Sequence, residues 1–385
     1  MLMNRLWLNL LLPLCLWLCS QPVRAQKGNA AQNRPRVGLV LSGGGAKGAA
    51  HIGVIRAVEQ AGIPIDYIAG TSMGAIVGGL YAMGYTTDEL EQLVKMQDWE
   101  MLLSDKSPRK QLSPEQRERK GRYILNIPLS RSAKPKMDGF VRGRNLGNML
   151  ARLTVGYHDS ISFDSLHIPF ACVATNLANG DEVVLRSGKL SAAIRASMAI
   201  PGVFTPVVME GKTLVDGGLC NNFPVDVARR MGADIVIGST VQRVFNDTMQ
   251  QGGIQSVVQQ LISISSQFEE NIQLCNLHIG VNPKGVSTMD FSPEKLDTMI
   301  RRGYETARQH QRTLQQIALA TGVHFPYDPK LRFPVKRPVL LPSGFLPIHC
   351  AAPTRQPWHR PCLNFKAATP PGQQVAKEAC SPIFK

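Results

Sequence analysis

The sequence predicts an α/β fold, in which a mainly parallel central sheet forms the middle layer of a three-layer α/β/α sandwich. Apolar runs typical of buried strands alternate with segments whose apolar residues recur at helical spacing. Glycine-rich turns join two of these strands directly to the helices that follow them. Such alternation is typical of parallel strands connected by helices that cover both faces of the sheet.

The first strand–helix unit begins with the apolar residues 37–41, which end at a run of glycines. The segment from Ala49 to Ala61 then carries Ile52, Ile55 and Val58 at helical spacing. We therefore expect a buried strand, a glycine loop and a helix in that order.

The second unit is a strand at Tyr67 to Ala69, followed by a sharp turn and a helix that begins at Met73. Thr86 and Glu89 have the spacing of a capping box, which predicts the start of another helix. Further strands are predicted at residues 170–175, 214–215 and 233–238.

Two more helices are predicted at residues 253–275 and 293–321, where they pack as the last layer on the sheet. Ser292 occupies the cap position of the second helix, Pro293 lies in its first turn and Gly322 follows its end. These residue types are typical of helix boundaries.

The chain begins with the features of a secretory signal peptide. An apolar run from Leu6 to Leu18 is followed by Val23 and Ala25, small residues typical of a cleavage site. The run is shorter than the roughly 20 apolar residues that cross a membrane. We therefore expect an exported protein, in the periplasm or associated with the outer membrane or cell surface.

The composition changes near the C-terminal end, where proline and basic residues become frequent and periodicity is lost. Such a segment cannot bury enough apolar surface to fold. A reading-frame error and a genuine basic linker are both explanations for it. The predicted segments are a signal peptide (1–25), a linker (26–34), the main domain (35–285), a helical extension (286–329) and a disordered basic, proline-rich tail (330–385).

The formal net charge of +15 does not by itself indicate a nucleic-acid-binding protein. Much of the excess lies in the two terminal segments, and no nucleic-acid-binding motif accompanies it. Cysteines and histidines do not show the spacing of metal ligands either. We therefore expect neither a nucleic-acid partner nor a metal site.

A G-x-S-x-G sequence carries the first candidate catalytic residue, Ser72. It comprises Gly70, Thr71, Ser72, Met73 and Gly74, and it lies between a predicted strand and a predicted helix. This is the setting of a nucleophile elbow, a tight turn in which glycines on both sides leave the serine exposed to substrate. The helix N-terminus behind the serine adds positive potential where an oxyanion forms.

A glycine loop directly after the first strand permits two interpretations. It satisfies the dinucleotide fingerprint G-x-G-x-x-G, and it also suits an oxyanion hole for Ser72. The dinucleotide interpretation expects an acidic residue at the end of the second strand, but Asp66 stands at its beginning. This mismatch favours the oxyanion hole. The loop consists of Gly43, Gly44, Gly45, Ala46, Lys47 and Gly48.

A serine nucleophile needs a base, and two residues qualify. His278 is the histidine whose position suits a Ser, Asp, His order. Asp216 is the stronger candidate, because it ends a predicted strand and is followed by Gly217 and Gly218. Since strand ends in a parallel sheet converge on one edge, we expect Asp216 and Ser72 to meet there.

Together the glycine loop, the G-x-S-x-G turn and the Asp216-Gly217-Gly218 sequence resemble the patatin-like phospholipases. The resemblance extends to residues 196–201 (Ala-Ser-Met-Ala-Ile-Pro) and 221–224 (Asn-Asn-Phe-Pro), and it covers about residues 35–285. It implies the patatin-like α/β/α sandwich and a Ser–Asp dyad without histidine. The sequence looks most like the exported bacterial branch, in which a periplasmic domain and an outer-membrane β-barrel commonly follow; neither follows here.

The resemblance implies a serine acyl-hydrolase of lipid or phospholipid esters, that is, a carboxylic ester hydrolase that requires no cofactor and works at a membrane surface. Asp216 would accept the Ser72 proton while amides of the glycine loop hold the oxyanion. We expect Asp216 to be partly desolvated, since an ordinary carboxylate is a weak base for a hydroxyl. The alternatives are a small-ester or thioester hydrolase, a dinucleotide-binding module and an inert scaffold.

Overall fold

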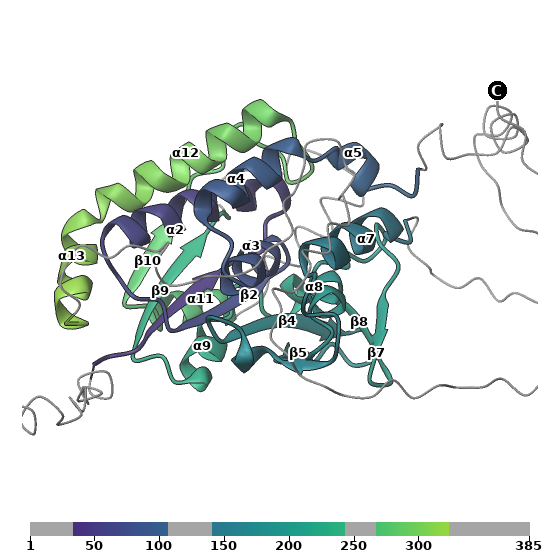
Figure 1. Ribbon diagram of the computed structural model, residues 1–385, viewed down its shortest axis with the longest axis horizontal. Helices are drawn as coiled ribbons and strands as arrows, with labels where there is room; N and C mark the ends of the chain where they lie inside the picture. The colour runs from purple at the N-terminus through teal and green to yellow at the C-terminus, as the bar shows by residue number, and fades with distance from the viewer. Residues whose placement is uncertain (1–33, 107–140, 243–266, 323–385) are drawn as a thin grey trace, which may run out of the picture. The chain divides into compact units, whose positions relative to one another are not determined.

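The computed structural model describes residues 34–106, 141–242 and 267–322 (Figure 1). The predicted signal peptide, nearly all of the linker, the start of the predicted helix 253–275 and the basic tail lie outside the described residues. Among the helices of these three ranges, none is long and apolar enough to cross a membrane.

The centre of the fold is a mixed sheet whose strands pair in the order β10-β9-β1-β2-β4-β8-β7, with β5 also paired to β4. Strands β10, β9, β1, β2 and β4 are parallel, whereas β5 and β8 run antiparallel to β4 and β7 antiparallel to β8. The mainly parallel sheet is confirmed. Its strands are β1 (Val37–Leu41), β2 (Tyr67–Thr71), β4 (Phe170–Asn176), β5 (Glu182–Leu185), β7 (Val207–Met209), β8 (Lys212–Asp216), β9 (Ile235–Thr240) and β10 (Leu277–Gly280).

Strands β2 and β8 share one edge of β4. Val173 of β4 pairs with Thr71 of β2, and the next residue, Ala174, pairs with Asp216 of β8. Strand β5 pairs with both of these β4 residues on the opposite edge. Because β2 is parallel to β4 and β8 antiparallel, the two strands approach each other end to end and stop at adjacent positions.

Helices form the outer layers of the sandwich, and a small two-stranded sheet of β3 (Ile161–Ser162) and β6 (Ser187–Gly188) lies apart from the main sheet. Single turns of 3₁₀ helix, η2 (Gly45–Ala49) and η5 (Gly217–Leu219), follow β1 and β8. The helices are α2 (Ala50–Gln60), α3 (Met73–Ala82), α4 (Thr87–Met96), α5 (Trp99–Leu102), α7 (Arg144–Leu153), α8 (Leu190–Ser197), α9 (Val225–Met231), α11 (Gln267–Gln273), α12 (Pro293–Gln309) and α13 (Gln311–Ala320).

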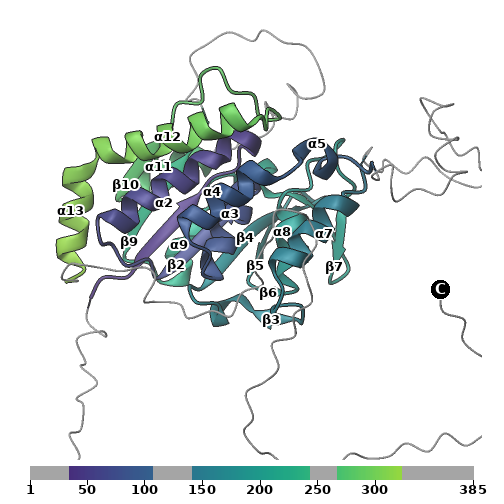
Figure 2. The same ribbon diagram turned by 45° about the horizontal axis from the view of Figure 1, so that its top comes forward.

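Two hydrophobic cores lie on opposite faces of the sheet. Successive strand residues point to opposite faces, so Leu39 and Leu41 enter the larger core while Val40 between them enters the smaller one. The larger core also takes residues of α2, α3, α4, α7, α8 and α12, whereas the smaller core is covered by α9 and α11. Figures 1 and 2 show α2, α4 and α12 side by side over one face.

Helices α2 and α12 cross at two glycines. A Cβ atom on Gly53 would lie 2.0 Å from the Ile300 carbonyl oxygen, and a Cβ on Gly303 would lie 2.0 Å from the Ala50 carbonyl oxygen. Neither separation is possible without a shift of backbone. The absence of side chains at these two positions therefore sets how closely α12 approaches α2.

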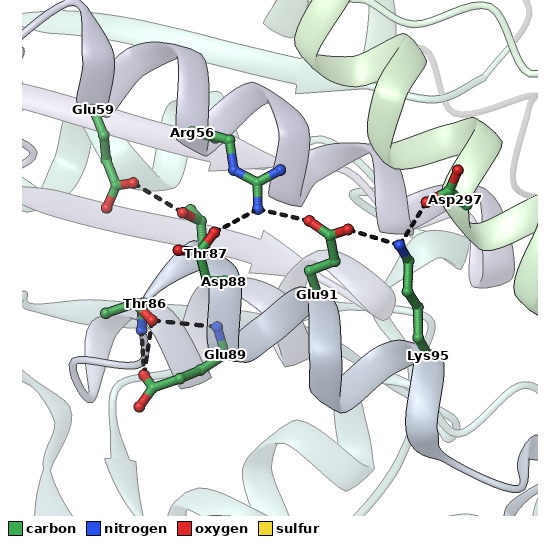
Figure 3. Close-up of polar contacts among 9 residues, drawn as sticks. All are labelled: Arg56, Glu59, Thr86, Thr87, Asp88, Glu89, Glu91, Lys95 and Asp297. Atoms are coloured by element: carbon green, nitrogen blue, oxygen red, sulfur yellow. Dashed lines mark hydrogen bonds and ion pairs between the residues drawn. The ribbon is translucent and has the colours of Figure 1, made fainter.

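Polar side chains tie α4 to α2 and α12 at the rim of this layer (Figure 3). The capping box is confirmed: Thr86 Oγ1 accepts from the Glu89 N–H, and the Glu89 carboxylate accepts from the Thr86 N–H. Glu91 accepts from Arg56 of α2 at 2.6 Å and from Lys95 at 2.7 Å, and Lys95 also pairs with Asp297 of α12.

The predicted helix 293–321 is wrong in one respect, since it is two helices with a break at His310. Pro293 lies in the first turn as expected. Ser292 occupies the cap position but makes no side-chain cap bond; its hydroxyl donates to Asp290. The helix α12 packs along α2, which itself covers the sheet.

Candidate active site

Ser72 lies at the turn between β2 and α3. Its backbone has φ 54° and ψ −117°, a conformation that costs energy for a residue with a side chain. The Ser72 N–H donates to Ser197 Oγ at 3.0 Å, and Ser197 Oγ donates to the Val173 carbonyl at 2.5 Å. These bonds hold the strained serine backbone against β4.

The flanking glycines are required by close backbone contacts. A Cβ atom on Gly70 would lie 2.5 Å from the Gly74 carbonyl oxygen, and one on Gly74 would lie 2.2 Å from the Leu41 carbonyl oxygen. The turn therefore has the geometry expected of a nucleophile elbow, with Thr71 and Met73 on either side of the serine. Thr71 Oγ1 donates to the Asn221 carbonyl at 2.9 Å and so anchors the turn to the segment that follows Asp216.

Asp216 ends β8 and faces Ser72. Ser72 Oγ donates to Asp216 Oδ2 at 2.8 Å, and the Gly218 N–H donates to Asp216 Oδ1 at 2.8 Å. A Cβ atom on Gly217 would lie 2.2 Å from the Val173 carbonyl oxygen, so the turn after Asp216 also needs glycine. The two residues meet because β2 and β8 end at adjacent positions on β4, and not because both end parallel strands, as the sequence suggested.

Burial sets the chemistry of this pair. Ser72 is 7% exposed and Asp216 2% exposed. Desolvation raises the pKa of Asp216 from 3.8 to about 6, while the hydrogen bonds from Gly218 and Ser72 act in the opposite direction. A carboxylate with a raised pKa is a better proton acceptor, which agrees with the expectation that Asp216 is desolvated.

The glycine loop lies against Ser72, but only part of it has free amides. The Gly43 N–H donates to the Asn222 carbonyl at 3.2 Å, and the Ala46 N–H donates to the Thr288 carbonyl at 2.8 Å. Ala46 was expected to hold the oxyanion, and this contact corrects that expectation. Within the described ranges, the N–H groups of Gly44 and Gly45 have no acceptor.

Thr288 belongs to the helical extension and packs closely on the glycine loop. A Cβ atom on Gly45, whose φ is +57°, would lie 2.3 Å from the Thr288 carbonyl oxygen. This oxygen occupies the helix start where a dinucleotide would place its pyrophosphate. Lys47 and Gly48 follow in η2, and a Cβ on Gly48 would meet the Met73 side chain. The loop is thus built around the serine turn rather than around a nucleotide.

His51 is a supporting residue that the sequence reasoning missed. It is fully buried on α2, and its Nε2 lies 2.8 Å from the Ser42 carbonyl and its Nδ1 2.9 Å from Ser239 Oγ. Because a carbonyl only accepts, Nε2 carries the proton and Nδ1 accepts from Ser239. Burial lowers the pKa of His51 to about 4, so the ring is neutral and holds the residue that precedes Gly43.

His278 is not part of the site. It lies on β10, which β9 and β1 separate from β2, and its Nε2 is 2.8 Å from Thr240 Oγ1. Burial also lowers its pKa. The geometry therefore brings Ser72 together with Asp216 and leaves the alternative base on another part of the sheet.

Comparison with known proteins identifies a family that this chain matches and several similar proteins. Residues 39–229 match the family described as patatin-like phospholipase. The chain is 37% identical over 203 residues to an uncharacterized NTE family protein of Mycobacterium tuberculosis, which covers 53% of this chain and 48% of the relative. It is 34% identical over 224 residues to a patatin-like phospholipase domain-containing protein of Caenorhabditis elegans, covering 58% of this chain and 14% of that protein.

Two further matches are a curated fungal relative and a solved structure. A lysophospholipase of Mycosarcoma maydis is 34% identical over 220 residues, covering 55% of this chain and 10% of that protein. The crystal structure of VipD from Legionella pneumophila aligns with a TM-score of 0.40 at 17% identity, covering 73% of this chain and 67% of that one. The chain spans less than half the length of the three curated relatives. Through residues 39–229, the chain belongs to the patatin-like phospholipase family.

Proposed function

We propose that this protein is a serine acyl-hydrolase of lipid esters, with Ser72 as the nucleophile and Asp216 as its base. The observation that carries the proposal is the 2.8 Å hydrogen bond from Ser72 Oγ to the buried Asp216 carboxylate. The family match and a fungal relative named as a lysophospholipase support lipid esters as the substrate class. Export, proposed from residues 1–25, concerns a part of the chain outside the described residues.

The reaction follows from the positions of these groups. Asp216 takes the Ser72 proton as Oγ bonds to the ester carbonyl carbon, and the N–H groups of Gly44 and Gly45 stabilise the oxyanion. The carbon–oxygen bond to the alcohol then breaks, and the alcohol leaves with the proton held by Asp216. Water repeats the sequence on the acyl-enzyme and releases the fatty acid and free Ser72.

The pH dependence of hydrolysis is expected to report the buried carboxylate. Asp216 acts as a base only when it is ionised, and its pKa is raised to about 6. We therefore expect kcat/KM to fall below half its maximum near pH 6. The measurement is kcat/KM from pH 4 to 9, and an acid limb at the ordinary aspartate value would contradict the desolvated base.

The test of the function is hydrolysis by the full chain and by Ser72→Ala. Lysophospholipid, diacyl phospholipid and a short-chain ester are offered separately, and released fatty acid is measured. We expect hydrolysis of the long-chain lipids and loss of at least 10³-fold in the variant. Ser191→Ala, a serine on α8 without a role in the dyad, should retain wild-type rates.

The substrate panel also separates the alternatives. Faster turnover of the short-chain ester than of either lipid would favour a small-ester hydrolase. Hydrolysis that survives the loss of Ser72 would remove the nucleophile assignment altogether.

A further inference from the structure

Asn222 lies beside the Ser72–Asp216 pair, and its side chain is almost completely buried. Its exposed fraction is 2%, and its side-chain Nδ2 has no hydrogen-bond acceptor among the described residues. Its main chain is well fixed, because the Asn222 carbonyl accepts the Gly43 N–H. The residue is therefore anchored to the glycine loop while its amide nitrogen is unused.

Two glycines show where the amide lies. A Cβ atom on Gly43 would be 2.3 Å from Asn222 Oδ1 and 3.1 Å from Ser72 Cβ. A Cβ atom on Gly218 would be 2.9 Å from Asn222 Oδ1 and 3.1 Å from Asp216 Oδ1. The Asn222 amide therefore fills the space between the glycine loop and the turn after Asp216, next to both members of the pair.

An unpaired N–H group in this position destabilises the folded protein, since it has lost its bonds to water and gained none. In the proposed reaction at Ser72, the carbonyl oxygen of the substrate would become an oxyanion next to the glycine loop and would offer an acceptor to such a group. The last torsion of an asparagine side chain is broad and roughly two-fold. The amide can therefore turn its N–H groups toward either side of its present plane.

We propose that Asn222 is a catalytic residue, whose side-chain amide donates a hydrogen bond to the oxyanion together with the N–H groups of Gly44 and Gly45. The proposal rests on the proposed function of Ser72 and Asp216 and extends it by a side-chain donor. Such a donor interacts more strongly with the charged transition state than with the neutral ester. Its loss lowers kcat and leaves KM nearly unchanged.

The test compares the full-length wild type with Asn222→Leu, which keeps the approximate size of the side chain and removes the donor. We expect kcat to fall about 10²- to 10³-fold, with KM within a few-fold of wild type. We expect the melting temperature to stay the same or rise, because an unpaired buried polar group has been removed. A structural role would lower stability and activity together.

The matched control is Thr205→Val. Thr205 Oγ1 is likewise buried and without a partner in the described part of the chain, but the Thr205 backbone is bonded to Val141 and Arg195 rather than to the Ser72–Asp216 pair. This variant should keep the wild-type kcat. Asn222→Asp gives an independent readout: its charge repels the oxyanion and the Asp216 carboxylate, so kcat falls further and the acid limb moves to higher pH.

The outcomes separate the two proposals. Ser72-dependent hydrolysis in the wild type together with an unchanged kcat in Asn222→Leu would overturn the role of Asn222 alone. A fall in melting temperature that accounts for the lost activity, with no shift of the acid limb in Asn222→Asp, would also overturn it. A wild type without Ser72-dependent hydrolysis would remove both.

Discussion

Asp216→Asn is expected to abolish hydrolysis and, at pH 8, to make the folded protein more stable. The substitution removes the base, so kcat should fall about 10³- to 10⁴-fold. Asparagine keeps one oxygen, which accepts the Gly218 N–H, and its amide nitrogen takes the place of Oδ2 and donates to Ser72 Oγ, so the geometry is preserved. The substitution removes the free-energy penalty of burying an ionised carboxylate, since Asp216 is only 2% exposed.

The pKa of Asp216 gives the sign and size of the stability gain. Its value is about 6 in the folded protein and 3.8 as a free group, so the unfolded chain ionises first as pH rises. The wild type therefore loses stability between pH 3.8 and 6, by about 3 kcal/mol in total. Asp216→Asn has no carboxylate to ionise, so it does not lose this stability. Its free energy of unfolding should therefore exceed that of the wild type at pH 8, and this difference should be absent below pH 3.8.

Chemical denaturation at pH 3.5 and pH 8, together with kcat, tests both effects. Asp164→Asn is the control, because this exposed carboxylate forms a surface pair with Arg186. The control should retain activity and change stability by less than about 1 kcal/mol. A lower free energy of unfolding at pH 8 for Asp216→Asn would show that the carboxylate is not a destabilised group.

Gly303→Ala is expected to destabilise the protein by about 3 kcal/mol, although alanine is the better helix former. The new Cβ would lie 2.0 Å from the Ala50 carbonyl oxygen, so α12 must move away from α2. Since α2 follows the glycine loop directly, the displacement should also lower kcat. Thermal or urea unfolding and hydrolysis rates measure the two effects.

The control for this substitution is Gly147→Ala on α7. A Cβ atom at Gly147 meets nothing within 4 Å, and the residue lies inside a helix. The same chemical change should therefore stabilise the protein by about 0.5–1 kcal/mol. If both variants behave alike, the contact between α2 and α12 is looser than its glycines indicate.

The sequence predicts those parts of the fold whose signals are local. Strand β1, helix α2 and the turn at Ser72 are marked by apolar periodicity and by glycines, and the structure has them at nearly the predicted residues. The short edge strand β7 and the helix α7 were not predicted. Three residues of β7 contain too few positions to show alternation.

The sequence suggests candidate site residues, but it does not show how strand pairing brings them together. Ser72 and Asp216 stand in motifs, and motifs can be recognised without knowing how the strands pair. Three features of the site depend on residues far apart in the chain. They are the antiparallel direction of β8, the buried ring of His51 and the contact of Thr288 with Ala46. No local pattern reports such contacts, so sequence reasoning had no signal for them.

Because β2 and β8 meet end to end on β4, the site can assemble during synthesis only after these strands have emerged. During synthesis the N-terminal part of a chain emerges and folds first. A chain that has emerged as far as the turn after β2 contains Ser72 but lacks β4, the strand on which β8 brings Asp216 into place. The Thr288 carbonyl, which takes up the Ala46 N–H, arrives later still. The Ser72–Asp216 pair, and with it the proposed hydrolytic activity, therefore cannot form before β8 has been made.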